Sequence, residues 1–335
     1  LNGGYIMKVL VLGGAGYIGS HFVQKALKEG HEVAVIDNLS TGHIKALPKE
    51  VKFIEGDIRD SEFLDSVFEN NQFDSCVHFC AFSLVGESMN DPLKYFDNNV
   101  IGAIRLVQSM VKHNVKKIVF SSTAAVYGSH EEMPLTEETN TLPTNPYGES
   151  KLFMEKIFHW SDKAYGIKYV SLRYFNVAGA SSSGVIGEDH NPETHLIPII
   201  LQVPLKKRDF LTIFGNDYNT FDGTCIRDYI HVEDLADAHL KALKYLENNH
   251  DSNIFNLGSQ NGYSNLEILS TAREVTKHSI PSKIGDRRPG DPDKLIASNK
   301  KAKTVLGWEV KKDIKDIINS AWNFHKNNPN GFEDK

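Results

Sequence analysis

Short runs of apolar residues recur along the first half of the chain, at 9–12, 32–36, 51–55, 76–79, 117–121 and 169–173. These runs of four or five residues predict buried β-strands. Between them, apolar positions follow a helical spacing at 18–29, 92–113 and 147–165. Strands that alternate with helices in this way predict a parallel sheet covered on both faces. We therefore predict a Rossmann-type, doubly wound α/β fold.

The alternation weakens after Arg173, where Gly, Pro, Asn and Asp become frequent between 179 and 198 and again from 215 to 223. We expect a first domain over 7–178 and a smaller C-terminal domain mainly over 179–330. The apolar run at 254–258 again has strand character. It predicts that a segment near 230–260 returns to the first sheet, so that the boundary is not a single cut.

A glycine-rich loop follows the first predicted strand directly, with Gly13, Gly16 and Gly19 in the spacing G-x-x-G-x-x-G. Such a loop lets the backbone approach a pyrophosphate at a helix N-terminus, although the pattern alone also fits a plain turn. Asp37 ends the second strand, where a carboxylate can accept both hydroxyls of an adenosine ribose. No Lys or Arg follows until Lys45, so nothing nearby would neutralise a 2′-phosphate. Together these features predict NAD rather than NADP.

Tyr147 and Lys151 stand four residues apart in a predicted helix and therefore share one face of it. A neighbouring ammonium favours the ionised phenol, which could then take a proton from a sugar hydroxyl. An isolated pair of this kind is usually a solvated surface feature. This pair accompanies a dinucleotide signature, so we interpret it as catalytic.

Composition and charge exclude several classes of protein. The 335 residues carry a formal charge of −6, which argues against nucleic acid and anionic membranes as main partners. No apolar run approaches the ~20 residues of a membrane span and no secretory pattern is present, so we expect a cytoplasmic protein. The three cysteines have no companion ligands at zinc spacing, and we predict no metal. Residues 1–6, before Met7, are interpreted as foreign to the native chain.

A series of motifs runs through the whole chain from about Met7. The first half contains GGAGYIG at 13–19, DNLSTG at 37–42, GDIRD at 56–60, SSTAAVYG at 121–128, YGESK at 147–151 and RYFNVAG at 173–179. The second half contains IGEDH at 186–190, HLIP at 195–198, IFGNDYNTFDGTCIRDYIHVEDLADAH at 213–239 and RRPGD at 287–291. The series resembles the extended short-chain dehydrogenase/reductases, and within them the UDP-glucose 4-epimerase family.

The resemblance implies reversible interconversion of UDP-galactose and UDP-glucose by transient oxidation at C4 of the sugar with bound NAD. It places Tyr147 as acid/base, Lys151 as its electrostatic partner and nicotinamide-ribose ligand, and Thr123 as the hydroxyl that bonds the sugar O4. The implied NAD contacts include Tyr147 and Lys151 and, further, Gly13, Gly16, Tyr17, Ile18, Gly19, Asp37, Asn38, Leu39, Ser40, Thr41, Gly42, Asp57, Ile58, Phe79, Cys80, Ala81, Ser83, Asn98 (or Asn99) and Phe175.

The implied contacts with the UDP-sugar, besides Thr123, are Asn176, His195, Leu196, Thr212, Phe214, Arg227, Tyr229, Arg288, Asp291 and Leu295. Arg227 and Arg288 are the candidates for the diphosphate, because guanidinium binds phosphate bidentately. Three of these residues have a purely structural alternative. Arg227 could pair with Asp228 or Asp234, Phe214 could belong to the core, and His195 could simply begin a helix.

Three positions bear on the limits of the resemblance. Ser83 stands where several relatives place a Lys, and His195 replaces an Asn often found before LIP. Leu295 occupies the position that walls the sugar pocket, where glucose-only relatives tend to have Tyr. We therefore expect activity on UDP-glucose and UDP-galactose with some turnover of the N-acetylated pair. Leu295 could instead be ordinary core.

Three other functions remain open at this stage. A nucleotide-sugar 4,6-dehydratase would carry Asp-Glu after the catalytic hydroxyl, whereas Ala124 and Ala125 follow Thr123 here. A uronate epimerase is not separated by pattern alone. A catalytically dead NAD-binding regulator should lack part of the catalytic set, which this chain keeps. The resemblance also implies a homodimer formed through the helices expected at 92–113 and 147–165.

Overall fold

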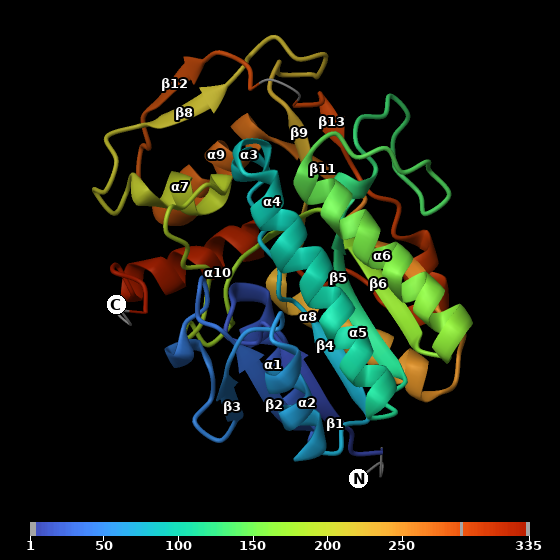
Figure 1. Cartoon of the computed structure of the whole chain (residues 1–335). Coiled ribbons are helices and arrows are strands. Elements are labelled where there is room, and N and C mark those ends of the chain that lie inside the picture. Colours follow the sequence, from blue (N-terminus) through green and yellow to red (C-terminus); the bar gives the residue numbers. More distant parts are fainter. Residues whose placement is uncertain (1–4, 289–290, 333–335) are drawn as a thin grey trace. The chain divides into compact units, whose positions relative to one another are not determined.

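The computed structural model describes residues 5–288 and 291–332 (Figure 1). Pro289 and Gly290 of the RRPGD motif and residues 1–4 lie outside the described residues. The chain forms two compact units: the first comprises 1–129, 137–173 and 236–255, and the second comprises 130–136, 174–235 and 256–335. Within the described ranges, no helix is both long and apolar enough to cross a membrane.

The first unit is built on a seven-stranded sheet in the order β10-β6-β5-β4-β1-β2-β3. Strand β1 pairs in parallel with both β2 and β4, so the strand order changes direction beside β1. In sheets of this type, ligands bind beyond the carboxyl ends of the strands at that point. The predicted Rossmann-type fold is confirmed. The strands are β1 (Lys8–Leu12), β2 (Glu32–Asp37), β3 (Lys52–Glu55), β4 (Ser75–His78), β5 (Lys117–Thr123), β6 (Lys168–Tyr174) and β10 (Asn253–Leu257).

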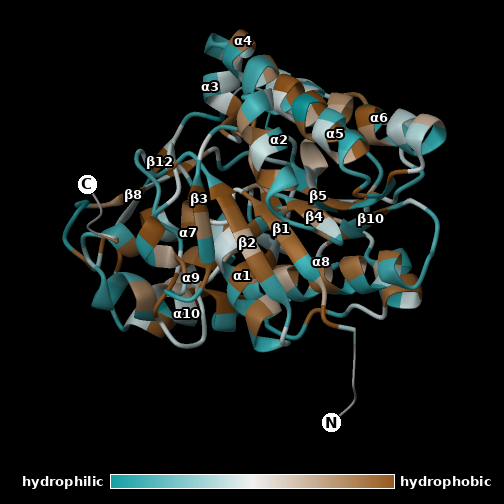
Figure 2. Cartoon of the chain, turned by 60° about the horizontal axis from the view of Figure 1, so that its bottom comes forward, coloured by the Kyte–Doolittle hydropathy of each residue, from teal (hydrophilic) through white to brown (hydrophobic). Residues whose placement is uncertain are grey.

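Helices carry their apolar faces onto this sheet. Figure 2 shows the strands β1, β2, β4 and β5 as predominantly hydrophobic, whereas the helices carry both kinds of residue. One core cluster joins sheet residues such as Leu10 and Phe120 to Leu106 and Phe158 of the helices. The helices are α1 (Tyr17–Lys28), α2 (Ser61–Glu69), α3 (Val85–Asn90), α4 (Pro92–Tyr95), α5 (Gly102–Lys112), α6 (Pro146–Tyr165) and α8 (Val232–Glu247).

The helix expected at 92–113 is interrupted. After α4 the chain forms a π-helical segment, Phe96–Ile101, and only then the regular helix α5. By contrast, α6 is a single helix with defined ends. The Asn145 side chain accepts from the amide of Gly148 at 2.9 Å, Pro146 occupies the first turn, and Gly166 ends the helix at φ 67°. This cap sets the start of α6 and so places Tyr147 in its first turn.

The second unit contains shorter sheets and its own core. Its core cluster includes Ile200, Ile213, Ile268 and Ile318, which come from four different elements. Strand β9 pairs with β7, β11 and β13, and β8 pairs with β12. The elements are β7 (Asn176–Ala178), α7 (Leu196–Gln202), β8 (Leu211–Phe214), β9 (Ile226–His231), β11 (Gly262–Ser264), α9 (Asn265–Thr276), β12 (Ser282–Gly285), β13 (Lys294–Leu295) and α10 (Ile314–Asn327).

Candidate functional site

Glycine stands at three positions of the loop after β1, and the reason for it differs from one position to the next. Gly13 has φ +80°, and a Cβ there would lie 2.7 Å from the amide nitrogen of Cys80. A Cβ on Gly19 would lie 2.1 Å from the carbonyl oxygen of Gly13. A Cβ on Gly16 would meet nothing closer than that same oxygen, at 3.4 Å. The protein itself therefore requires glycine at 13 and 19, whereas at Gly16 the missing side chain leaves a surface that a ligand can approach.

Asp37 lies at the carboxyl end of β2 with its carboxylate held in place. Its oxygens accept from the amides of Ala15 at 3.0 Å and Leu39 at 2.9 Å. Burial raises the pKa of this carboxyl, and the backbone N–H groups oppose the shift. The backbone amide of Asn38 also bonds the carboxylate. Three of its about four acceptor sites are thus used by the protein, which leaves room for a ribose hydroxyl.

A cleft in the first unit gathers most of the predicted cofactor residues. Eleven of them line it: Gly13, Gly16, Asp37, Asn38, Ser40, Thr41, Ile58, Phe79, Cys80, Ala81 and Asn98. Sequence analysis missed two lining residues, Gly56 and Phe82; Gly56 begins the GDIRD motif, so a signal existed. The lining of the described cleft does not include the other predicted cofactor residues, which are Tyr17, Ile18, Gly19, Leu39, Gly42, Asp57, Ser83, Tyr147, Lys151 and Phe175.

Two neighbouring asparagines have separate tasks. Asn98 lines the cleft and donates to the Asn99 side chain at 2.9 Å. Asn99 is fully buried and bonds the backbone N–H and C=O of Phe82 as well as the Ser150 hydroxyl. Of the two residues left open in the sequence, Asn98 therefore lines the cleft and Asn99 ties the cleft wall to α6; the contact of Asn98 with NAD stays a prediction.

The candidate catalytic residues lie at the end of β5 and in the first two turns of α6. Thr123 ends β5, and its hydroxyl bonds the Tyr147 phenol. Burial raises the pKa of Tyr147, and the bond from Thr123 only partly offsets this. Lys151 donates to the carbonyl of Ser121 at 2.8 Å, and burial lowers its pKa to about 7.

These directions correct one expectation. The sequence predicts that Lys151 lowers the pKa of Tyr147, but the described contacts of Lys151 are with Ser121 and with the Phe120 ring, 4.9 Å from its ammonium. Burial penalises both charged forms, so the protein alone keeps the phenol protonated. An ionised Tyr147 needs a further positive charge beside it.

A buried ion pair stands one turn beyond Lys151. The guanidinium of Arg173 donates twice to Glu155, at 2.9 and 2.6 Å, and once to the Tyr127 hydroxyl at 3.0 Å. Ser122 donates to the same carboxylate at 2.5 Å. The pair fixes α6 against β5 and β6, and its negative partner favours the charged form of Lys151. Sequence analysis missed this role for both charged residues.

In the second unit, three of the predicted substrate residues come together: Arg227 on β9, Leu295 on β13, and Asp291 just before β13. Arg227 pairs with Asp291, with 3.3 Å between Nη2 and Oδ1, and donates to the Pro292 carbonyl at 2.9 Å. Leu295 is the register partner of Arg227 in β13. Both alternatives for Arg227 are therefore wrong, because Asp228 accepts from Ser259 and Asp234 from backbone amides.

The other predicted substrate residues fall into separate places. Arg288 stacks over the Phe214 ring at 4.3 Å, on the strand that also carries Thr212. Asn176 and Tyr229 are register partners in β7 and β9, which places them on adjacent strands. His195 lies instead against Glu188 and Glu193, immediately before Leu196 and helix α7.

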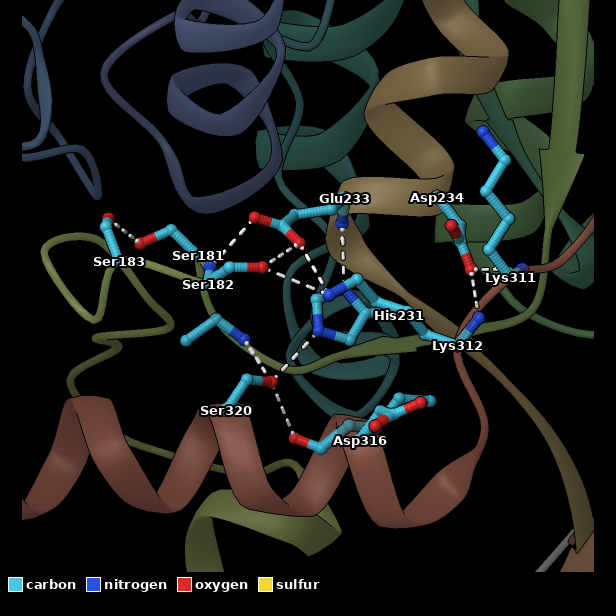
Figure 3. A network of polar contacts seen from close by, with 12 residues as sticks. Ser181, Ser182, Ser183, His231, Glu233, Asp234, Lys311, Lys312, Asp316 and Ser320 are labelled. Atoms are coloured by element: carbon cyan, nitrogen blue, oxygen red, sulfur yellow. Dashed lines mark hydrogen bonds and ion pairs between the residues drawn. The ribbon is translucent and has the colours of Figure 1, made fainter.

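The end of β9 is held by a polar network (Figure 3). His231 accepts from the amide of Glu233 at 3.0 Å and bonds Ser320 of α10 at 2.9 Å. Glu233 accepts from the amide and hydroxyl of Ser182 at 2.8 and 2.7 Å and pairs with Lys312 at 2.9 Å. The network anchors the strand that carries Arg227 and Tyr229.

Comparison with known proteins agrees with this geometry. A model of the NAD dependent epimerase/dehydratase family matches residues 9–258. The chain belongs to this family. Its relatives in the family include the UDP-glucose 4-epimerase of Lacticaseibacillus casei, which is 58% identical over 330 residues that cover 98% of this chain and 100% of that protein.

Solved structures of the family superpose closely. A crystal structure of a UDP-glucose 4-epimerase, 53% identical, has a TM-score of 0.96 and covers 97% of this chain and 99% of that one. The enzyme from Bifidobacterium longum, 40% identical and in complex with NAD+ and UDP, has a TM-score of 0.91 over 97% of this chain and 100% of its own.

Proposed function

We propose that Tyr147, Thr123 and Lys151 carry the proton chemistry of a reversible UDP-galactose/UDP-glucose interconversion. The protein is an NAD-dependent epimerase of the UDP-glucose 4-epimerase type. The observation that supports the residue assignment is the position of the three side chains. They lie at the end of β5 and the start of α6, in the same unit as the cleft lined by Gly13, Gly16 and Asp37.

The cleft residues fit NAD. Gly16 leaves room for the pyrophosphate, Asp37 has an oxygen lone pair for the adenosine ribose, and no lysine or arginine stands among the lining residues of the described cleft. When bound, NAD supplies the acceptor for the hydride of the sugar C4 and a positive charge beside the phenol. A positive charge beside the phenol favours its ionised form and so opposes the effect of burial, which raises the pKa of Tyr147.

Tyr147 takes the proton of the sugar O4 hydroxyl and returns it after the hydride has been delivered to the other face of the sugar. Thr123, bonded to the phenol, orients the same hydroxyl. Lys151, whose pKa lies at about 7, is partly ionised at neutral pH and can favour the phenolate further. Reaction on both faces requires that the sugar turn over inside the site.

A sugar that turns over cannot be held tightly, so the nucleotide must supply the binding energy. We assign the diphosphate to Arg227 and Arg288, and the uracil and its ribose to residues around Phe214, Tyr229 and Asp291. The ion pair with Asp291 holds the Arg227 guanidinium, which is mostly buried, in one orientation, and this lowers the entropic cost of binding phosphate.

We further propose a cytoplasmic homodimer. Exposed apolar side chains occur on the expected dimer helices: Leu93 is 76% exposed, and Phe153 and Trp160 on α6 are 47% and 68% exposed. The three cysteines are free, which suits a reducing compartment. Side activity on the N-acetylated pair stays a prediction from Leu295.

Incubation of the purified protein with UDP-galactose, without added NAD, tests the function. We expect UDP-glucose as the product and NAD(H) in the supernatant after denaturation. A 4,6-dehydratase would instead release a keto-deoxy sugar, and a uronate epimerase would turn over only UDP-uronates from a panel. Protein that contains only NADP, or apo protein that NAD does not activate, would overturn the cofactor assignment.

A further inference from the structure

The loop before α7 brings two imidazoles and two carboxylates to one point. Glu188, His190, Glu193 and His195 each offer one ligand atom, and these atoms all lie within 4.8 Å of one another. Among the described residues it is the one group of this kind found. All four lie in the second unit, within eight consecutive positions of the chain.

The distances between these ligand atoms are close to those between the ligands of a tetrahedrally coordinated metal ion. His195 Nδ1 lies 2.8 Å from a Glu188 oxygen and 3.0 Å from a Glu193 oxygen. His190 Nδ1 lies 3.2 Å from Glu188 and 3.8 Å from Glu193. Four ligands at about 2.1 Å from a tetrahedral zinc ion stand roughly 3.4 Å apart. The observed distances scatter around that edge length.

Hydrogen bonds within the group account for only part of this arrangement. His195 Nδ1 carries at most one proton, yet it faces oxygens of both carboxylates at hydrogen-bond distance. One oxygen of Glu188 is likewise shared between the two imidazoles. A divalent ion at the centre would neutralise both carboxylates and accept one lone pair from each of the four groups.

The surrounding chain holds the ligand atoms in place. Glu188 is 3% exposed, so its charge is withdrawn from water. The Glu193 carboxylate accepts from the backbone amides of Thr194 and His195 at 2.7 and 2.8 Å, which fixes its orientation. Asp189, between two of the ligands, points elsewhere and accepts from the amide of Phe332 at 2.9 Å. Outer contacts of this kind are typical of metal sites.

We propose that Glu188, His190, Glu193 and His195 bind one zinc ion as a structural site. The donor set of two imidazole nitrogens and two carboxylate oxygens suits zinc, and four protein ligands leave no open position for chemistry. The ion ties the loop to the start of α7. The sequence prediction of no metal rested on cysteine spacing and did not weigh this E-x-H-x-x-E-x-H pattern.

The test is zinc binding to full-length, tag-free protein treated with chelator and then dialysed against zinc chloride without UDP-sugar. Metal analysis should give one zinc per chain. Cobalt(II) in place of zinc should give the intense visible bands of a tetrahedral centre. Protein that takes up no zinc, or whose cobalt spectrum has only the weak bands of six-coordination, would overturn the proposal.

Variants distinguish the loop from the other histidines of the chain. His190→Ala and Glu193→Gln should weaken zinc affinity at least tenfold, whereas His159→Ala, at an exposed position on α6, should bind zinc like the wild type. If His190→Ala does not fold, His190→Asn and Glu193→Gln, checked by circular dichroism, serve instead. Folded variants with wild-type zinc affinity would contradict the assignment, as would a loss of zinc in His159→Ala.

Discussion

Alanine at Gly16 and alanine at Gly19 should separate cofactor binding from folding. Gly16 has φ −72° and ψ 172°, which any residue adopts, and its added Cβ meets no protein atom closer than 3.4 Å. Stability should therefore change little, and loss of glycine freedom in the unfolded chain favours alanine by about 0.4–1 kcal/mol. The new methyl group would stand where the pyrophosphate approaches, and we expect a loss of at least about tenfold in NAD affinity, or ~1.4 kcal/mol.

Gly19→Ala should have the reverse pattern. Its Cβ would lie 2.1 Å from the Gly13 carbonyl oxygen and 2.8 Å from the Gly14 Cα, so backbone must move. We expect a destabilisation of about 1–3 kcal/mol, reduced by up to ~1 kcal/mol of helix propensity.

The assay is urea unfolding of both variants and the wild type, with and without saturating NAD, together with the NAD content of each purified protein. NAD should stabilise the wild type strongly and Gly16→Ala weakly, because binding adds stability in proportion to the logarithm of affinity. Gly16→Ala that binds NAD like the wild type would refute the interpretation of this glycine, and Gly19→Ala with unchanged stability would refute the packing argument.

Four further predictions concern single side chains. Tyr147→Phe should lose several orders of magnitude in kcat in the coupled epimerase assay while titration still detects UDP-sugar binding, since only the proton acceptor is removed. The pKa of Lys151 is about 7 in the folded protein and 10.5 in an ordinary lysine, so between these pH values the unfolded chain binds more protons than the folded one. The free energy of unfolding should therefore rise with pH across that window. Urea unfolding should show this slope in the wild type and a flatter one in Lys151→Met. Leu295→Tyr should suppress turnover of the N-acetylated pair far more than turnover of UDP-glucose, and equal loss of both would reject this residue as the gate. Burial opposes ionisation of Glu233, but bonds from Ser182 and Lys312 hold its pKa at about 2. The ionised carboxylate should therefore contribute about 1–2 kcal/mol to the free energy of unfolding above pH ~4.5, and this contribution should fade as the pH falls toward 2. In urea unfolding, Glu233→Gln should lack this pH dependence.

The strands and the glycine loop could be predicted because their causes are local. Buried parallel strands need apolar runs. Gly13 has a positive φ, and the glycine-rich loop motif predicts such a conformation there. Asn98 and Asn99 could not be assigned, because the sequence does not state which neighbouring side chain faces the cleft and which faces Ser150.

The sequence did not predict features that depend on burial or on partners distant in the chain. Burial raises the pKa of Tyr147, and the opposing contribution comes from the Thr123 hydroxyl. The ion-pair partner of Arg227 is Asp291, which is remote in sequence, and neither of the alternative partners considered from the sequence, Asp228 and Asp234. For His195, the sequence did not indicate the contacts with two glutamates of its own loop, and its predicted contact with the substrate stays a prediction.

The first unit includes residues 236–255, which the ribosome makes only after 174–235 of the second unit. These residues include the first part of β10, which borders β6 at the edge of the sheet, and His239, whose ring lies 4.7 Å from Phe79 and bonds Ser121 at 2.7 Å. Until they emerge, β6 is an open strand edge, a surface prone to misassociation. The nascent sheet must therefore wait through the synthesis of roughly eighty residues, between the end of β6 at Tyr174 and the start of β10 at Asn253, before its edge is covered, and a fragment that ends near 178 would keep that edge exposed permanently.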